Sequence, residues 1–192
     1  MSTLWWVRHG PTHAPGYVGW SDVEADLSDS AALARLSRAL PAAAAVVSSD
    51  LKRAIATADA IAGARRRLPH MAALREMNFG AWEGLSHAQV EARDARLARA
   101  FVERPGDIAP PGGESWNALA ARVSAAADAL ARRHAGGDIV VVAHLAVILT
   151  QLRRALDCPA AEVLGQPIDN LSLTCLERAD GRWRMRLVNV RP

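Results

Sequence analysis

The sequence is poor in cysteine and has no long hydrophobic run. Its 192 residues contain two cysteines, Cys158 and Cys175, which are too few for the disulfide framework of a small secreted protein and are typical of a reducing compartment. No apolar run reaches the roughly 18 residues that a membrane-spanning helix needs. The N-terminus also lacks the charged segment and apolar core of a signal peptide. We therefore expect a cytoplasmic protein that does not associate with membranes.

Lysine and clustered positive charge are also scarce. Lys52 is the only lysine, and 23 basic and 20 acidic residues give a formal net charge of +3. The arginines are scattered, as at Arg93, Arg96 and Arg99, without interleaved aromatic residues. This pattern is typical of solvated helix faces rather than of a nucleic-acid-binding surface, so no nucleic-acid partner is expected.

Strand and helix patterns alternate along most of the chain and predict an α/β fold, namely a three-layer α/β/α sandwich with a mostly parallel sheet. Apolar and polar residues alternate on both sides of Asp180-Gly181, which predicts a C-terminal antiparallel hairpin at one edge. Ser86 and Gln89 form a capping-box pattern at the start of one helix. No repeat or linker interrupts residues 1–192, so we expect a single domain and a monomer or homodimer. Helices are expected over residues 31–40, 51–67, 86–103, 114–135 and 145–156.

Two short apolar runs each end at a histidine. The first is Leu4–Val7, followed by Arg8 and His9, and the second is residues 138–143, followed by His144. Both runs are typical of parallel strands that are buried on both faces. Ligands of such sheets bind at the carboxyl ends of the strands, so we expect both histidines at that edge. The alternative for each histidine alone is a strand cap or a polar core residue.

A third strand pattern ends in serine and aspartate at positions 48–50 and leads into an alanine-rich helix. These residue types are expected to cap that helix, whose N-terminus offers free N–H groups and the positive end of the helix dipole. Arg53 falls in its first turn, where the dipole disfavours a cation. Such an arginine is explained either by solvent exposure or by an anion bound in front of it.

Residues 74–84 match neither a helix nor a strand and form an aromatic- and glycine-rich loop with two carboxylates, Glu76 and Glu83. Loops on a rigid scaffold frequently hold functional groups, although loop glutamates are also commonly just solvated. A zinc site built from His9, His144 and Glu76 is one alternative. It is the weaker one, because arginines seldom lie beside metal ligands and no His-x-x-x-His or Cys-x-x-Cys spacing occurs. No metal and no other cofactor is expected.

In these segments the chain resembles the histidine phosphatase superfamily, from Leu4 to about Leu149. That family includes cofactor-dependent phosphoglycerate mutase, fructose-2,6-bisphosphatase and α-ribazole phosphatase. The blocks occur here in the family's order, and it is their combination that is specific. The matching blocks are Arg8-His9-Gly10, Ser48 to Ala54 with Thr57-Ala58, Glu76 with Phe79 to Gly84, Gly112 to Ser115, and Val140 to His144.

The resemblance implies the roles of the site residues. It makes His9 the nucleophile that becomes phosphorylated and Glu76 the proton donor, with His144 as a further catalytic residue in the phosphate pocket. A neutral imidazole can attack phosphorus, and a glutamate of raised pKa can protonate the leaving alkoxide and then activate water. Fixed cations meet the charge on the phosphoryl oxygens, so no metal is required. The residues implied to bind the substrate phosphate are Arg8, Gly10, Thr12, Gly19, Arg53 and Leu145.

The chain departs from the family pattern in two places. Pro15 stands where the family often has asparagine, and Leu145 and Ala146 follow the second histidine, where glycine is common. The loop Gly19–Asp22 does resemble the segment after the family's nucleophile. Mutases carry inserted residues after the glutamate loop, whereas this chain goes from Gly84 directly into a helix.

We therefore expect a phosphomonoester hydrolase that acts on a small phosphorylated metabolite, such as α-ribazole 5′-phosphate or a sugar phosphate. Phosphoprotein is a further open substrate class. Two alternatives remain, a phosphoglycerate mutase-type phosphoryl transfer and a catalytically impaired domain that only binds a phosphorylated ligand. Hydrolysis of a generic aryl phosphate would separate the enzyme from the binding domain.

Overall fold

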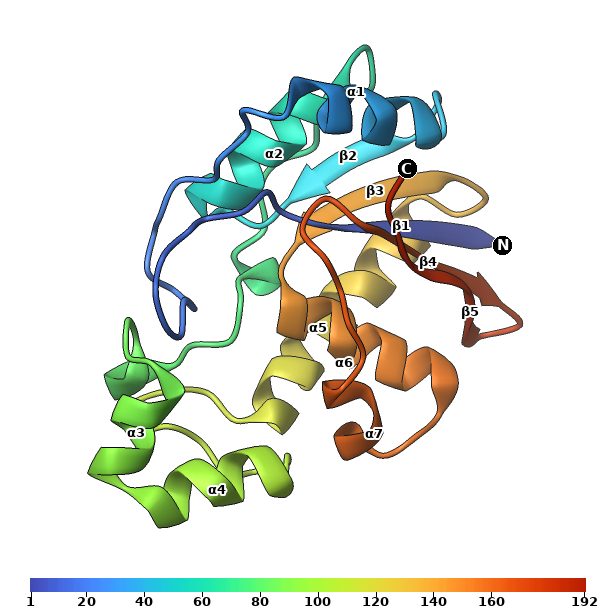
Figure 1. Ribbon diagram of the computed structural model, residues 1–192. Coiled ribbons are helices and arrows are strands. Elements are labelled where there is room, and N and C mark those ends of the chain that lie inside the picture. The colour runs from blue at the N-terminus through green and yellow to red at the C-terminus, as the bar shows by residue number, and fades with distance from the viewer.

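The computed structural model describes residues 1–192 and has a five-stranded mixed sheet at its centre (Figure 1). The strands are β1 Ser2–Arg8, β2 Ala45–Ser48, β3 Asp138–Ala143, β4 Leu173–Ala179 and β5 Arg182–Val190. Their order across the sheet is β2-β3-β1-β4-β5. β1, β2 and β3 are parallel, whereas β4 pairs antiparallel with both β1 and β5. The sheet therefore has a parallel core and the predicted antiparallel hairpin at one edge.

Helices cover both faces of this sheet. They are α1 Ser30–Ala39, α2 Lys52–Ala62, α3 His87–Arg93, α4 Ala95–Glu103, α5 Trp116–Arg133, α6 Leu145–Leu156 and α7 Ala160–Leu164, with single 3₁₀ turns at Ala72–Leu74 and Gly80–Trp82. α1 and α2 lie on one face, α5 and α6 lie on the other, and α3 and α4 project beyond the sheet (Figure 1). This arrangement confirms the predicted three-layer sandwich. None of the helices combines the length and apolar character needed to cross a membrane.

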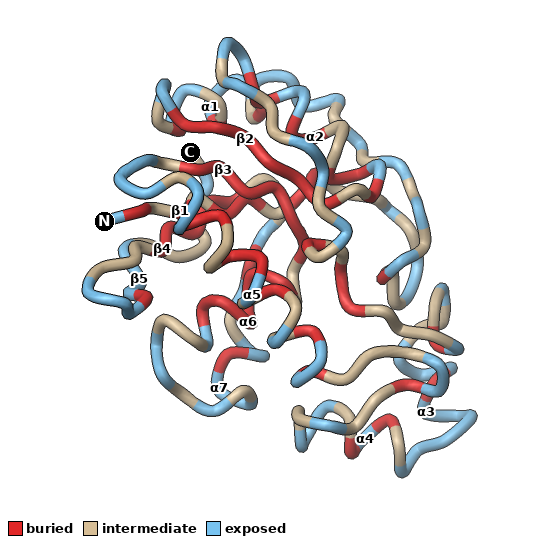
Figure 2. Tube along the Cα trace, turned by 180° about the vertical axis from the view of Figure 1, so that it is seen from behind, coloured by how far each residue is buried: buried red, intermediate tan, exposed pale blue.

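The central strands supply a hydrophobic core on each side of the sheet, because successive side chains of a strand point to opposite faces. Trp6 and Val141 join the core beneath α5 and α6, whereas Val7 and Val142 join the one beneath α1 and α2. All four side chains are fully buried. A strand covered on both faces must be apolar throughout, which explains the unbroken hydrophobic runs of β1 and β3. Buried backbone is concentrated in these strands (Figure 2).

The C-terminal hairpin has the turn that its sequence predicts. Asp180 and Gly181 have φ angles of 52° and 77°, and a two-residue turn with both angles positive matches the right-handed twist of the flanking strands. The alternation of Leu171, Leu173 and Cys175 with polar residues predicts that the first strand of the hairpin includes Leu171, but β4 begins at Leu173 and Leu171 lies outside it.

Two predicted helices differ in length from those in the structure. The helix predicted for 51–67 ends at Ala62, because Gly63 adopts a φ of 54° and the chain turns back. Arg67 then pairs with Val46 of β2 in an isolated bridge. The helix predicted for 86–103 is two helices, because Asp94 takes an extended conformation and its side chain caps α4. The predicted capping box of Ser86 and Gln89 is present at the start of α3.

The prediction that a residue of the segment 48–50 caps α2 is wrong. The residue at the N-cap is Leu51, which has no capping side chain, and the Lys52 amide at the start of α2 donates to the carboxylate of Asp22, from the loop after β1, at 2.7 Å. The Asp50 carboxylate instead accepts two hydrogen bonds of 2.7 Å from the Arg75 guanidinium. That ion pair ties the start of α2 to the loop that contains Glu76.

Asp128 of α5 joins three elements that lie far apart in the sequence. Its carboxylate accepts hydrogen bonds of 3.0 and 2.9 Å from Arg154 of α6 and of 3.0 Å from the Trp183 indole of β5.

We expect Asp128→Ala to lower the free energy of unfolding by about 1–3 kcal/mol, because the indole N–H and the guanidinium lose their acceptor. Urea titration of the variant and of Glu91→Ala, an exposed carboxylate of α3, measures the effect. Equal stabilities of the two variants would contradict this role.

Candidate active site

The register of β1 and β3 brings His9 and His144 together at the carboxyl edge of the sheet. Arg8 is paired with Ala143 in the parallel ladder, so the next residue of each chain segment lies on the same rung. The His9 amide donates to the Ala143 carbonyl at 3.0 Å. The two imidazole rings are 5.0 Å apart between centroids and inclined by 60°. Both histidines are buried, at the position that their strand-end location predicts.

His9 is held as a neutral imidazole with one defined tautomer. Its Nδ1 lies 2.7 Å from the Gly10 carbonyl, which can only accept, and its Nε2 accepts from Arg53 Nε–H at 3.2 Å. The proton is therefore on Nδ1, and the lone pair is on Nε2. Burial, and after it the adjacent Arg53 guanidinium, lower the pKa of His9 from 6.5 to about 3. Nε2 is thus available as a nucleophile at neutral pH.

Arg53 points into the site from the first turn of α2 and is only 1% exposed, so solvent exposure does not explain it. Its Nη1 donates to the Ser21 carbonyl at 2.8 Å and its Nη2 donates to the Gly19 carbonyl at 2.6 Å. Each Nη carries two N–H groups, so each keeps one donor besides the one that binds a loop carbonyl. The arrangement places a fixed cation next to the candidate nucleophile.

His144 and Arg8 have buried nitrogen atoms that lack hydrogen-bond partners. Neither ring nitrogen of His144 has a partner, nor does Nε of Arg8, although Arg8 Nη1 donates to the Ile168 carbonyl at 2.6 Å. Burial, followed by the nearby His9, lowers the pKa of His144 well below 6.5. Buried polar groups without partners are uncommon in folded proteins. Their concentration at this edge indicates a site that an oxygen-rich ligand would complete.

Glu76 enters the site from the loop after α2 and is 7% exposed. Its Oε1 accepts from the Met77 amide at 2.9 Å, and its Oε2 accepts from the Ala146 amide at 3.2 Å. Burial raises the pKa of Glu76 above 4.5, against the opposing effect of these amides and of Arg53 and Arg8. Glu76 therefore has the protonation behaviour of a general acid.

Glu83 has a different environment and lies outside the pocket. Its carboxylate accepts from the amides of Gly19, Trp20, Ser21 and Phe79 and from the Ser21 hydroxyl at 2.6–3.3 Å. Although burial opposes ionisation, the hydrogen bonds, led by that of Ser21, hold the pKa of Glu83 below 4.5. Glu83 is therefore an anchor for residues 19–21, the loop whose carbonyls bind Arg53.

The two glycines implied in phosphate binding act through their packing in this structure. The Gly10 amide donates to Thr57 Oγ1 at 3.0 Å, and the Gly19 amide donates to Glu83 at 3.1 Å. Both N–H groups are therefore engaged within the protein, and a direct contact of these glycines with phosphate stays a prediction. A Cβ at Gly19 would clash with the backbone carbonyl oxygen of Met77, so the close approach of these two segments requires glycine there.

The two remaining residues of that group are Thr12 and Leu145. Thr12 is half-buried in the loop after β1, and Leu145 is half-buried as the first residue of α6. The Leu145 side chain lines an apolar cavity beside the site. The zinc alternative finds no support, because no three histidine, cysteine or acidic side chains are grouped so as to hold a metal ion.

Three further residues position the site, and the sequence motifs single out only one of them, Thr57. Thr57 Oγ1 donates to the Arg53 carbonyl at 2.7 Å while it accepts from Gly10, and it belongs to a matched block. Arg122 Nη2 donates to the Glu76 carbonyl and Asn170 Nδ2 donates to the His9 carbonyl, at 2.8 and 2.7 Å. Neither Arg122 nor Asn170 lies in a matched block, and only the tertiary structure identifies them.

Several known proteins are similar to this chain over most of its length. The bifunctional protein Rv2228c of Mycobacterium tuberculosis is 39% identical over 150 residues, which are 76% of this chain but only 40% of that protein. The chain thus spans less than half of that relative. The metal-independent phosphoserine phosphatase of Arabidopsis thaliana is 30% identical over 92% of this chain and 76% of its own length.

The fold is also found among solved structures. Bacillus stearothermophilus YhfR superposes with a TM-score of 0.90 at 27% identity, and the match covers 98% of this chain and 97% of YhfR. A model of the histidine phosphatase superfamily (branch 1) matches residues 4–191, a range that includes both strand-end histidines, Arg53 and Glu76. This chain belongs to the histidine phosphatase superfamily, branch 1.

Proposed function

We propose that the protein hydrolyses phosphate monoesters of small metabolites through a phosphohistidine on His9. The observation that carries this proposal is the fixed, neutral imidazole, whose Nε2 faces the buried Arg53 guanidinium at 3.2 Å. A phosphoryl group bound by Arg53 would present its phosphorus to Nε2. The match of the family model to residues 4–191 supports one functional domain over the whole chain.

In the first step, Nε2 of His9 forms a bond to phosphorus and the bond from phosphorus to the ester oxygen breaks. Glu76 transfers its proton to that oxygen, so the product leaves as a neutral alcohol. Arg8, Arg53 and His144 meet the charge that spreads over the phosphoryl oxygens. The Nδ1–H bond to the Gly10 carbonyl stabilises the positive charge that the imidazole gains.

In the second step, the Glu76 carboxylate accepts a proton from water as the water oxygen attacks phosphorus. The bond between phosphorus and Nε2 breaks, its electron pair returns to His9, and inorganic phosphate leaves. The enzyme recovers a neutral imidazole and a protonated Glu76. The chain's own residues supply every group in both steps, so the mechanism needs no metal.

Three features favour an active hydrolase over the two alternatives. The chain passes from Gly84 to the N-cap of α3 at Ser86 without an inserted segment, unlike the mutases. Pro15 is exposed, and Ala146 still donates its amide to Glu76, so neither departure from the family pattern displaces a catalytic group. The substrates named for related phosphatases are candidates here, namely phosphoserine, glucosyl-3-phosphoglycerate and α-ribazole 5′-phosphate.

His9→Ala removes the nucleophile and should lower the turnover of p-nitrophenyl phosphate by at least about a thousandfold. Quenching the wild type with labelled substrate should trap an acid-labile, base-stable phosphoenzyme that the variant lacks. His13→Ala, at an exposed histidine paired with Asp26, is the matched control and should keep both turnover and label. Wild-type turnover in His9→Ala would refute the assignment of the nucleophile.

Turnover of the wild type should survive exhaustive treatment with EDTA, because arginines and a histidine meet the charge on the phosphoryl oxygens. Loss of activity in EDTA that only zinc restores would refute the metal-independent mechanism.

Glu76→Gln keeps the shape of the side chain but cannot donate a proton. We expect kcat to fall by about 10²–10⁴-fold on alkyl phosphates and by less than about tenfold on aryl phosphates, whose leaving groups need little protonation. In the wild type, kcat/KM on alkyl phosphates, which reports the groups of the free enzyme, should fall as pH rises through the raised pKa of Glu76. On the acid side, the lowered pKa of His9 in the free enzyme, about 3, should keep the nucleophile neutral. The fall at high pH should be absent from pH–rate profiles of Glu76→Gln.

Glu83→Gln tests the positioning role of the second carboxylate. Weaker anchoring of residues 19–21 should displace Arg53 and lower kcat/KM by about 10–100-fold. The loss should be equal for alkyl and aryl phosphates, and the fall in rate at high pH should remain. If the loss is confined to alkyl phosphates, Glu83 is the proton donor and the assignment of Glu76 fails.

A further inference from the structure

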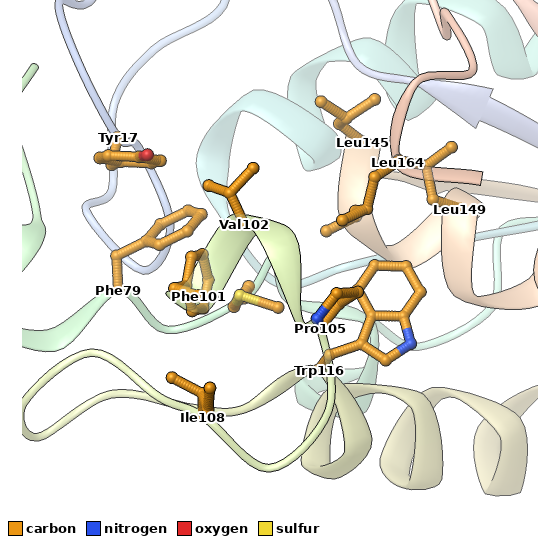
Figure 3. Close-up of a pocket in the computed structure, with 12 residues that line it drawn as sticks. Tyr17, Phe79, Phe101, Val102, Pro105, Ile108, Trp116, Leu145, Leu149 and Leu164 are labelled. Carbon is orange, nitrogen blue, oxygen red and sulfur yellow. The ribbon is translucent and has the colours of Figure 1, made fainter. Parts of the chain in front are cut away.

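An apolar cavity of about 240 Å³ lies beside the catalytic edge, and 11 of its 12 lining residues are hydrophobic. Tyr17, Phe79 and Phe101 lie on one side of it, and Trp116, Leu145 and Leu149 lie on the other (Figure 3). The walls come from the loop after β1, the Glu76 loop, α4, the start of α5, α6 and α7. The cavity thus lies between the projecting helix α4 and the helices that pack on the sheet.

The carboxylate of Glu76 lies against two residues that line this cavity. The two amides that bind its carboxylate belong to Met77 and Ala146, and both of these residues line the cavity. Leu145, which directly follows His144, lines it as well. An ester oxygen that receives the Glu76 proton would therefore lie at the cavity entrance, with its carbon skeleton directed among these side chains.

Two apolar side chains that line the cavity are exposed to solvent and would be covered by a bound ligand. Val102 of α4 is 47% exposed and Leu164 of α7 is 36% exposed, and both line the cavity. An apolar group held between them would remove this surface from water, which is favourable. A sugar there would exchange water for few hydrogen-bonding partners, which is unfavourable.

We propose that this cavity binds the leaving group of the substrate and that the preferred substrates are phosphate monoesters of apolar alcohols bearing one ring or an equivalent alkyl chain. The size is suitable, since an apolar cavity of about 150 Å³ holds one benzene molecule. This inference rests on the proposed phosphatase activity and narrows its substrate class. It favours arylalkyl phosphates over sugar phosphates.

This preference can be tested with ethyl phosphate, 2-phenylethyl phosphate and glucose 6-phosphate. All three release a primary alkoxide, so each needs a proton from Glu76 to a similar degree. We expect kcat/KM for 2-phenylethyl phosphate to exceed that for ethyl phosphate by about 10–100-fold, from burial of the phenyl group. Glucose 6-phosphate should be no better than ethyl phosphate. If either ethyl phosphate or glucose 6-phosphate matches 2-phenylethyl phosphate, the inference is overturned.

The double variant Val102→Gln/Leu164→Gln locates the preference. It should reduce the ratio of kcat/KM for 2-phenylethyl to ethyl phosphate to within about threefold of unity. The matched control is Leu156→Gln/Val190→Gln, which changes two exposed apolar residues that do not line the cavity, and it should keep the wild-type ratio. An unchanged ratio in the Val102/Leu164 variant would show that the apolar group binds elsewhere.

Hydrolysis of p-nitrophenyl phosphate distinguishes a failure of the proposed substrate preference from a failure of the proposed phosphatase activity. If the enzyme forms the phosphoenzyme and hydrolyses this ester but lacks the 2-phenylethyl preference, the phosphatase stands and the cavity assignment falls. If neither the phosphoenzyme nor hydrolysis of any ester is observed, the proposed function fails and the inference fails with it.

Discussion

The buried contact between Arg53 and His9 is the constraint on which the rest of the site depends. A guanidinium removed from water must find acceptors, and here the carbonyls of Gly19 and Ser21 supply them. Those carbonyls face Arg53 because Glu83 binds the amides of the same loop. The charge that results next to His9 adds to burial in keeping the imidazole neutral. Arg53 thus links the conformation of residues 19–21 to the protonation state of His9, to which burial contributes most.

This arrangement opposes stability in the absence of ligand. Each buried polar atom without a partner costs about 1–3 kcal/mol, and His144 contributes two such atoms and Arg8 one. The sandwich tolerates them because two hydrophobic cores, of 23 and 13 buried residues, flank the sheet. A bound oxyanion would accept hydrogen bonds from the N–H groups among these atoms and would stabilise the folded protein by mass action. The site is therefore preorganised for an anion at the expense of the free protein.

The sequence alone predicts those parts of the structure that follow from local pattern. Both histidines are at strand ends because the hydrophobic runs of β1 and β3 end there, and the parallel register then makes them neighbours. Asp180 and Gly181 likewise predict their turn. The break at Asp94 is also local, because its side chain caps α4 through the Leu97 amide, but helical periodicity runs through it and does not reveal it. The direction of Arg53 depends on the carbonyls of Gly19 and Ser21, which are far away in the sequence. The same holds for Arg122, which reaches the Glu76 backbone from the middle of α5.

The projecting helices α3 and α4 have a small core of their own, formed by Trp82, Val90 and Ala98, which is separate from the two cores of the sandwich. The proposed nucleophile, acid and phosphate ligands lie at the sheet edge, in its adjoining loops and in the first turn of α2, whereas α4 contributes to the wall of the apolar cavity. If this cavity receives the leaving group as we propose, substitutions on its side of α4 change which alcohols fit without altering any residue proposed for phosphoryl transfer. Substrate preference and phosphoryl-transfer chemistry are then encoded in different parts of the chain and can change independently in evolution.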